Sequence, residues 1–279
     1  MWLFVNRKVL GKPTDSYHYF LCLMLVKIIA DSYAVFAHIV YLSLEQFFDN
    51  KRMTQPVYDE YPKIHVAVDC VIFTYDEEQL KVLLYPRNIE PRKGDWSLMG
   101  GFVGDRESLE DAARRVLKQT VGLSDIFMQQ VHGFSKPNRE PDERVISMAF
   151  YALICNDKHN RELVEEHKGE WYPITKLPPL IFDHREMINA ALQCLQYKAS
   201  NELIGRELLP EKFTLTQMNN LYNAIFQRTF DQGNFRKKIA SLKVLIQTPD
   251  KDTTTSKKGA YLYVFPHNYV ASDCRIVKM

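Results

Sequence analysis

The chain has 279 residues, of which 46% are hydrophobic and 25% charged, a composition that favours folded domains and excludes a disordered chain. Its five cysteines are scattered and contain no CxxC pair, which argues against a disulfide framework or a zinc site and favours a reducing cytoplasm. The net charge of +2 hides an asymmetry, because residues 205–279 carry +6 and the remainder −4. A basic C-terminal part on an acidic body is typical of a nucleic-acid contact, although a solvated charged face has the same composition.

Residues 1–53 differ in composition from the rest of the chain. The stretch 17–48 is rich in apolar and aromatic residues, but Lys27, Asp31 and His38 interrupt it, which is costly inside a bilayer. It lacks a clear signal-peptide core and cleavage site. Three interpretations stay open: an extension produced by a start site upstream of Met53, a helical appendage, or a membrane anchor. We favour the first and expect no membrane partner.

The next segment predicts two strands of a buried sheet. Val66–Phe73 is a mostly apolar run, and Gln79–Tyr85 follows it after an acidic turn. Asp69 interrupts the first run, and because an unpaired buried carboxylate is costly, we expect it to have a partner or a ligand. Paired glycines end the run Trp96–Gly101, where they allow the backbone to approach a ligand closely.

Residues 101–123 have the spacing of a Nudix box, G-x5-E-x7-R-E-U-x-E-E-x-G-U, where U is a bulky apolar residue. The matching positions are Gly101, Glu107, Arg115, Leu117, Gly122 and Leu123. Val116, Gln119 and Thr120 replace the three glutamates that follow the arginine. Nudix enzymes need such carboxylates, because they bind the Mg²⁺ that neutralises phosphate and activates water. The resemblance therefore implies a Nudix fold without catalytic residues, metal or cofactor. We expect the box helix to begin near Leu109, with Ser108 or Asp105 as its cap.

The C-terminal part predicts a winged helix-turn-helix. A helix over 183–200 precedes it, and a second helix over 213–226 opens on a capping box of Thr214 and Gln217. Asp231 caps a third helix over 234–242, whose residues Phe235, Ile239 and Leu242 share one face. Two strands, 244–247 and 260–265, flank a polar loop with several lysines. The helix over 234–242 is cationic, and such a helix followed by a hairpin is typical of a recognition helix and its wing.

Taken together, the chain resembles the Nudix-related transcriptional regulators of bacteria. The segments that carry the likeness are 95–103, 107–117, 143–154, 177–188, 213–226 and 234–239. The resemblance implies an α/β Nudix-like sandwich, a mixed sheet with flanking helices, over residues 54–202, followed by a winged helix-turn-helix domain over 203–279. It also implies a cytoplasmic, homodimeric repressor that binds double-stranded operator DNA and a small-molecule effector.

Two branches of this family differ in effector, ADP-ribose in the NrtR type and arabinose in the AraR type. The run WSLMGGFV and the RVL that replaces the box's R-E-U look closer to the arabinose branch. We therefore predict L-arabinose as effector and sugar catabolism as the regulated process, with ADP-ribose and NAD metabolism as the alternative. The expected effector-binding residues are Asp69, Arg87, Trp96, Glu107, Arg115, Glu143, Arg144 and Tyr151. Of these, Glu107 and Arg115 have a competing role as a loop-holding pair, and Trp96 as a core residue.

The expected DNA-binding residues are Thr216, Gln217, Asn234, Arg236, Lys237, Lys238, Lys257 and Lys258. Two other classes of function stay open. A divergent hydrolase would use Glu107, Glu110 and Asp111 as metal ligands in a shifted arrangement. An RNA-binding module would expose aromatic stacking positions, whereas the C-terminal Tyr and Phe residues alternate as strand core.

Overall fold

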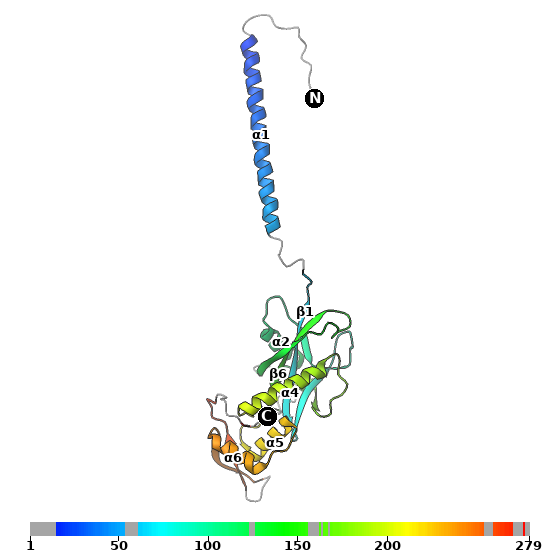
Figure 1. Ribbon diagram of the computed structural model, residues 1–279, viewed down its shortest axis with the longest axis vertical. Coiled ribbons are helices and arrows are strands. Elements are labelled where there is room, and N and C mark those ends of the chain that lie inside the picture. Colours follow the sequence, from blue (N-terminus) through cyan, green and yellow to red (C-terminus); the bar gives the residue numbers. More distant parts are fainter. Residues whose placement is uncertain are drawn as a thin grey trace. The chain divides into compact units, whose positions relative to one another are not determined.

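The computed structural model describes residues 15–53, 61–122, 126–155, 162, 164–166, 168–253, 259–269 and 276, and the chain divides into two units after Lys63. The first unit contains one 39-residue helix, α1 (Asp15–Met53) (Figure 1). Its stretch Phe20–Leu44 is long and apolar enough to cross a membrane by length and composition. One such helix near an N-terminus is weak evidence, because signal sequences have the same properties. The segment is thus helical, which fits both a helical appendage and a membrane anchor and does not test the interpretation as an upstream start.

A seven-stranded mixed sheet forms the centre of the first domain in the second unit. Its central path runs β3-β2-β1-β6-β5, with β4 paired to β1 and β7 to β2. β1 runs parallel to β6 and antiparallel to β2 and β4. The strands are β1 (His65–Asp76), β2 (Gln79–Pro86), β3 (Trp96–Ser97), β4 (Met99–Phe102), β5 (Phe127–Phe134), β6 (Val145–Leu153) and β7 (Glu170–Pro173). The predicted mixed sheet is confirmed.

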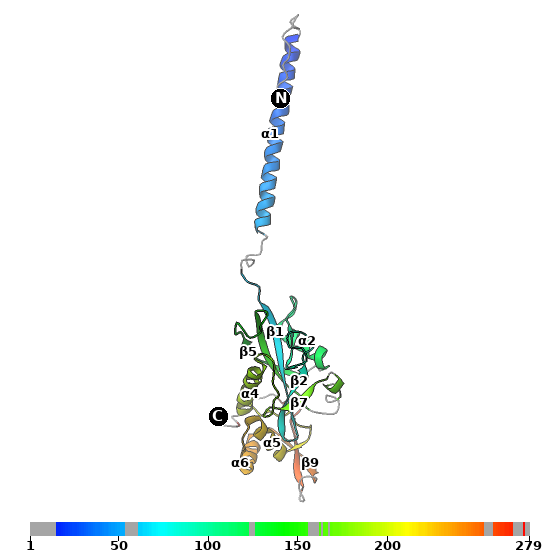
Figure 2. The same cartoon turned by 90° about the vertical axis from the view of Figure 1, so that its right-hand side faces the viewer.

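Helices cover both faces of this sheet. Successive side chains of a strand point to opposite sides, so the apolar strands have side chains to bury on each face. Val68 and Ile72 of β1 belong to the core beneath α2 (Leu109–Val121), whereas Val71 belongs to the core beneath α4 (His184–Asn201) (Figure 2). The Ser108 side chain accepts a hydrogen bond from the Asp111 amide, so α2 begins where the sequence predicts.

The C-terminal domain is a winged helix. Its elements are β8 (Phe213–Thr214), α5 (Leu215–Phe226), α6 (Gln232–Leu242), β9 (Ile246–Asp252) and β10 (Ala260–Val264), with a three-stranded sheet in the order β8-β10-β9. The predicted caps are confirmed, because Thr214 and Gln217 form a capping box and Asp231 accepts from the Asn234 amide. The first wing strand, however, begins at Ile246 rather than Val244 and continues to Asp252. Backbone pairing with β10 extends it into the segment predicted as loop.

One hydrophobic core joins the two domains. Residues of α4, α5 and α6 belong to the same buried cluster, together with Leu203, Ile204, Leu208 and Leu209 from the connecting segment. The Gln196 side chain of α4 donates to the Ile225 carbonyl of α5 at 2.9 Å. The connection between the domains is therefore packed into this core.

Candidate functional site

A small pocket of about 80 Å³ opens between β1, β2, β4 and the start of α4. Its lining residues are Ala67, Asp69, Tyr85, Arg87, Asn88, Ile89, Ser97, Gly100, Gly101, Phe102, Glu140 and His184. Gly100 lies against Asp69 across the β1–β4 pair, and a Cβ at Gly100 would lie 2.2 Å from Asp69 Oδ1. Any side chain at Gly100 would displace Asp69, so the site requires glycine here. The predicted approach of the backbone to a ligand stays a prediction.

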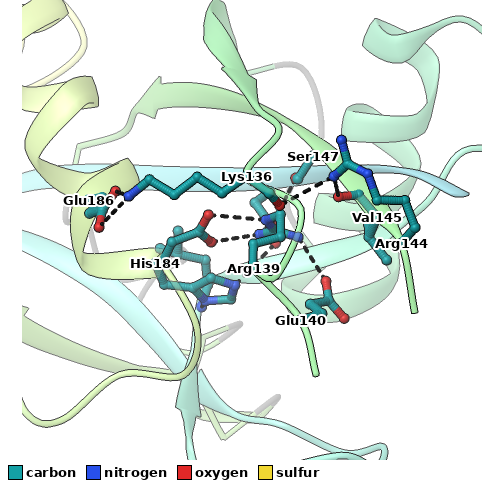
Figure 3. Close-up of polar contacts among 11 residues, drawn as sticks. Lys136, Arg139, Glu140, Arg144, Val145, Ser147, His184 and Glu186 are labelled. Carbon is teal, nitrogen blue, oxygen red and sulfur yellow. Dashed lines mark hydrogen bonds and ion pairs between the residues drawn. The ribbon is translucent and has the colours of Figure 1, made fainter. Parts of the chain in front are cut away.

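Asp69 belongs to a buried polar network that includes Ser147 and Arg139. Figure 3 shows Arg139 and Ser147 of this network. Asp69 accepts a 2.6 Å hydrogen bond from Ser147 Oγ, and Arg139 Nη2 lies 3.7 Å from its Oδ2. The Arg139 side chain is only 1% exposed and binds Asp183 through Nε and Nη2, at 3.1 and 2.7 Å. Its Nη1 donates to Glu140 at 2.7 Å. The partner expected for Asp69 is therefore present, and a single buried guanidinium holds several carboxylates.

His184, the first residue of α4, presents a defined proton donor to this pocket. The Leu98 amide donates to His184 Nδ1 at 3.0 Å, so Nδ1 carries no proton. Burial lowers the pKa of His184, and Asp69 only partly opposes this effect. The neutral ring therefore carries its proton on Nε2, which lies 3.7 Å from Asp69 Oδ1. The pocket thus combines an N–H donor with a carboxylate acceptor, a pair that suits hydroxyl groups.

The box helix has an apolar side chain where the Nudix pattern has a metal-binding glutamate. Val116 is 3% exposed, and its Cγ2 lies 2.8 Å from where a Cβ of Gly101 would be, so it fills the space beneath the loop. No group of three His, Cys, Asp or Glu side chains in the described part of the chain is placed to hold a metal ion. The shifted metal set of the hydrolase alternative is not assembled there.

Glu107 and Arg115 hold the loop that precedes α2. Glu107 accepts from Arg115 at 2.6 Å and from the Gly104 amide at 2.6 Å, while Arg115 also donates to the Phe102 carbonyl. The Arg115 hydrogen bond, with that from Gly104, lowers the pKa of Glu107 to about 2. Neither residue lines the pocket. Of the two roles considered for this pair, the structure shows the loop-holding contacts.

Asp69 and Arg87 are the only predicted effector residues that line the pocket. Trp96 packs edge-on against Tyr172, with ring centroids 5.1 Å apart. Tyr151 is fully buried on the α4 side of the sheet and donates to Gln129 at 2.8 Å.

Glu143 and Arg144 lie elsewhere. Glu143 is exposed, and Arg144 donates to the carbonyls of Ser135 and Lys136 in the β5–β6 loop (Figure 3). In their place the fold brings Glu140 and His184 to the pocket. Periodicity could not find these residues, because one lies in a polar loop and the other at a helix start.

The predicted DNA-binding residues fall into three groups. Asn234, Arg236 and Lys237 are exposed on α6, and Lys238 is half-buried. Arg236 donates to Thr216 on α5 at 2.7 Å, whereas Gln217 uses its side chain to cap α5. Lys257 and Lys258 lie outside the described residues.

Comparison with known proteins identifies both domains. Residues 63–191 match the NUDIX domain profile and residues 205–265 match the NrtR DNA-binding winged helix domain. An ADPR responsive transcriptional repressor from Acinetobacter baylyi is 29% identical over 231 residues, 81% of this chain and 90% of its own length. An ADP-ribose pyrophosphatase from Methanocaldococcus jannaschii is 35% identical over 123 residues, 44% of this chain and 70% of its own length.

A solved structure agrees with this assignment. NrtR from Shewanella oneidensis, crystallised with a 27mer DNA, has a TM-score of 0.65 and 28% identity, covering 72% of this chain and 93% of that one. The order of a Nudix sheet, α4, α5, α6 and a wing described above accounts for a match across both domains. The chain therefore belongs to the Nudix family and has the two-domain organisation of the NrtR-type transcriptional regulators.

Proposed function

We propose that the protein is a cytoplasmic transcriptional repressor that binds ADP-ribose in its Nudix domain and operator DNA through its winged helix. Two copies would act together, as a two-fold operator requires. The observation that carries this proposal is the pocket itself. Asp69 and His184 meet there from β1 and α4, and both elements extend to the DNA-binding domain. Among the described residues no cluster of side chains is placed to hold a metal, and the pocket is packed onto a DNA-binding domain; both observations favour a sensor over a hydrolase.

ADP-ribose replaces L-arabinose as the leading effector. Two relatives of the chain are named for ADP-ribose, and neither name refers to arabinose. The pocket chemistry suits ribose hydroxyls, which would donate to the Asp69 carboxylate and accept from His184 Nε2–H. Arg87, the single cation among the described lining residues, would face the diphosphate. Since L-arabinose also presents hydroxyl groups, it belongs in the test as the competing ligand.

Two elements would transmit occupancy of the pocket to α5. β1 carries Asp69, and the turn that follows β1 places Glu78 Oε1 2.7 Å from the Asn220 side chain of α5. α4 carries His184 and binds α5 through Gln196. A ligand that bridges Asp69 and His184 would favour one position of β1 relative to α4. It would change DNA affinity only if it binds that arrangement more tightly than the other.

Fluorescence anisotropy tests the proposal with a duplex selected by the protein from a random-core library. We expect ADP-ribose to weaken DNA binding by roughly 5- to 150-fold, the usual range of allosteric coupling. A response to L-arabinose alone would restore the sugar branch. Unchanged DNA affinity with both ligands would refute the sensor. Release of AMP from ADP-ribose in the presence of Mg²⁺ would identify a hydrolase instead.

The coupling route has its own test. Asn220→Ala removes the contact with Glu78 and should reduce the effect of ADP-ribose on DNA affinity, while ADP-ribose affinity itself stays unchanged. Gln79→Ala is the matched control, because Gln79 is the exposed residue that follows Glu78 at the start of β2. Equal behaviour of the two variants would contradict the route through the turn.

A further inference from the structure

The winged helix contains a groove of about 510 Å³ bounded by the first turn of α5, one flank of α6 and strand β10. Its polar lining includes Thr216, Gln232, Arg236, Tyr261 and Tyr263. No carboxylate is among the described residues that line it. A concave surface of this kind beside a recognition helix favours an anionic ligand over a cationic one.

The hydrogen bonds at Thr216 leave the groove rich in donors. Its hydroxyl oxygen accepts from Arg236 Nη2 at 2.7 Å and from Gln232 Nε2 at 3.2 Å. A hydroxyl oxygen has two lone pairs, so both are used and only its O–H proton remains. That proton has no acceptor among the residues that the structure describes. Arg236 has five N–H donors, of which this contact uses one. The unused donors match the acceptor oxygens of a phosphate.

A second cation, Lys251 of β9, lies next to the wall of the groove that β10 forms. Lys251 Nζ lies 4.6 Å from the ring centroid of Tyr261, which lines the groove from β10. Arg236 belongs to α6 on one side of the groove, and Lys251 belongs to the wing on the other side. A single DNA phosphate between them would be held from both sides, which positions the duplex without reading its sequence.

Other residues of α6 are better placed for reading bases. Phe235 and Ile239 are buried, and at 100° per residue Lys237 lies about 200° from Phe235, on the outward ridge of the helix. Asn234 and Lys237 are exposed, and neither side chain has a hydrogen-bonding partner within the described part of the chain. Arg236 differs from them, because its bond to Thr216 draws it to the flank of the helix.

We propose that Arg236, Thr216 and Lys251 form the seat of one backbone phosphate, and that Asn234 and Lys237 read base edges. Lysine pairs with the O6 and N7 acceptors of guanine, and asparagine with the N6 and N7 groups of adenine. This division of roles rests on the proposed DNA binding. It assigns affinity to the groove and sequence preference to the outward ridge of α6.

Two measurements on the full chain test the division. The first is anisotropy with a fixed mixed-sequence 30-bp duplex between about 50 and 200 mM salt, a range over which phosphate contacts dominate the change in affinity. The second is selection and sequencing of a random-core duplex library. Arg236→Ala and Lys237→Ala form a matched pair, because each removes one exposed positive charge from adjacent positions of α6.

We expect Arg236→Ala to reduce the salt slope by about 0.9 for each lost phosphate contact and to leave the selected consensus unchanged. Lys237→Ala should change the consensus, with a loss of discrimination of about 5- to 150-fold at one base pair, and reduce the salt slope less. Thr216→Val keeps the charge and volume, so it should weaken binding to the mixed duplex several-fold at an unchanged slope.

The opposite pattern overturns the proposal: a changed consensus in Arg236→Ala at an unaltered slope, or a reduced slope in Lys237→Ala at an unaltered consensus. Failure of the unsubstituted protein to bind either duplex would instead refute the proposed DNA binding. Thermal unfolding of each variant shows whether a loss of binding reflects a loss of folding. These residues lie at the surface or half-buried, so we expect unchanged midpoints.

Discussion

Replacing Arg139 with leucine tests whether the buried polar network depends on this single cation. The arginine side chain is 1% exposed, and it contacts Asp183, Glu140 and Asp69, whose side chains are 8%, 15% and 9% exposed. Leucine fills part of the volume but leaves these carboxylates without a counter-charge. Removing one partner of a buried ion pair costs about 3–5 kcal/mol. Since a domain is stable by only about 5–15 kcal/mol, the variant should lose a large part of its free energy of unfolding.

The loss should also depend on pH. Arg139 partly opposes the rise that burial causes in the pKa of Glu140, so without the guanidinium this pKa should lie further above its unfolded value. The folded variant then binds more protons than its unfolded chain, so its stability falls as pH rises through this range. Burial already raises the pKa of Glu140 in the unsubstituted protein. The deficit relative to the unsubstituted protein should therefore be smaller at pH 5 than at pH 8.

Urea unfolding followed by tryptophan fluorescence at both pH values measures the effect. Lys136→Ala is the matched control, because it breaks the exposed ion pair with Glu186, 2.7 Å long, in the same region (Figure 3). Exposed pairs contribute little, so this variant should unfold like the unsubstituted protein. A loss below about 1 kcal/mol for Arg139→Leu, far under the buried-pair range, or a deficit independent of pH would refute the reasoning.

Three further predictions concern the pocket and its loop. His184→Leu leaves the buried Leu98 amide without an acceptor and should cost about 1–3 kcal/mol in chemical denaturation. Because burial lowers the pKa of His184, the unsubstituted protein should lose stability as pH falls below about 6.5. Gly100→Ala forces a Cβ to within 2.2 Å of Asp69 Oδ1, so it should abolish ADP-ribose binding in calorimetry and destabilise by about 1–3 kcal/mol. The Glu107 carboxyl should titrate at about pH 2 by NMR, and its stabilising contribution should be lost as pH falls from 4.5 to 2.

Two of these predictions have a control variant, and the third has a result that would contradict it. His184→Asn keeps an acceptor near the Leu98 amide and should be milder than His184→Leu. Gly133→Ala is the match for Gly100→Ala, because its nearest neighbouring atom would be 3.5 Å away. Normal ADP-ribose affinity in Gly100→Ala would show that the ligand binds elsewhere. An ordinary titration of Glu107 near pH 4.5 would show that Arg115 does not hold it in solution.

The expected effector, L-arabinose, is the part of the function predicted from the sequence that agrees least with the named relatives. The preference for arabinose depended on the run WSLMGGFV. In the structure Leu98 and Met99 are fully buried, and Trp96 packs against Tyr172. Part of this run therefore reflects packing of the sheet, whereas Ser97, Gly100, Gly101 and Phe102 line the pocket. Residues that pack a core carry little information about which ligand a neighbouring pocket binds.

The sequence by itself determined the two domains, because their signals are local. The box spacing predicted the loop and α2, Thr214 with Gln217 predicted the start of α5, and the cations of α6 indicated the DNA-binding face. Only the tertiary structure decided the pocket, since Asp69, Glu140 and His184 are far apart in the chain and meet through sheet pairing and helix packing. Caps and helical periodicity act over a few residues, whereas a buried charge network is satisfied only when distant segments come together.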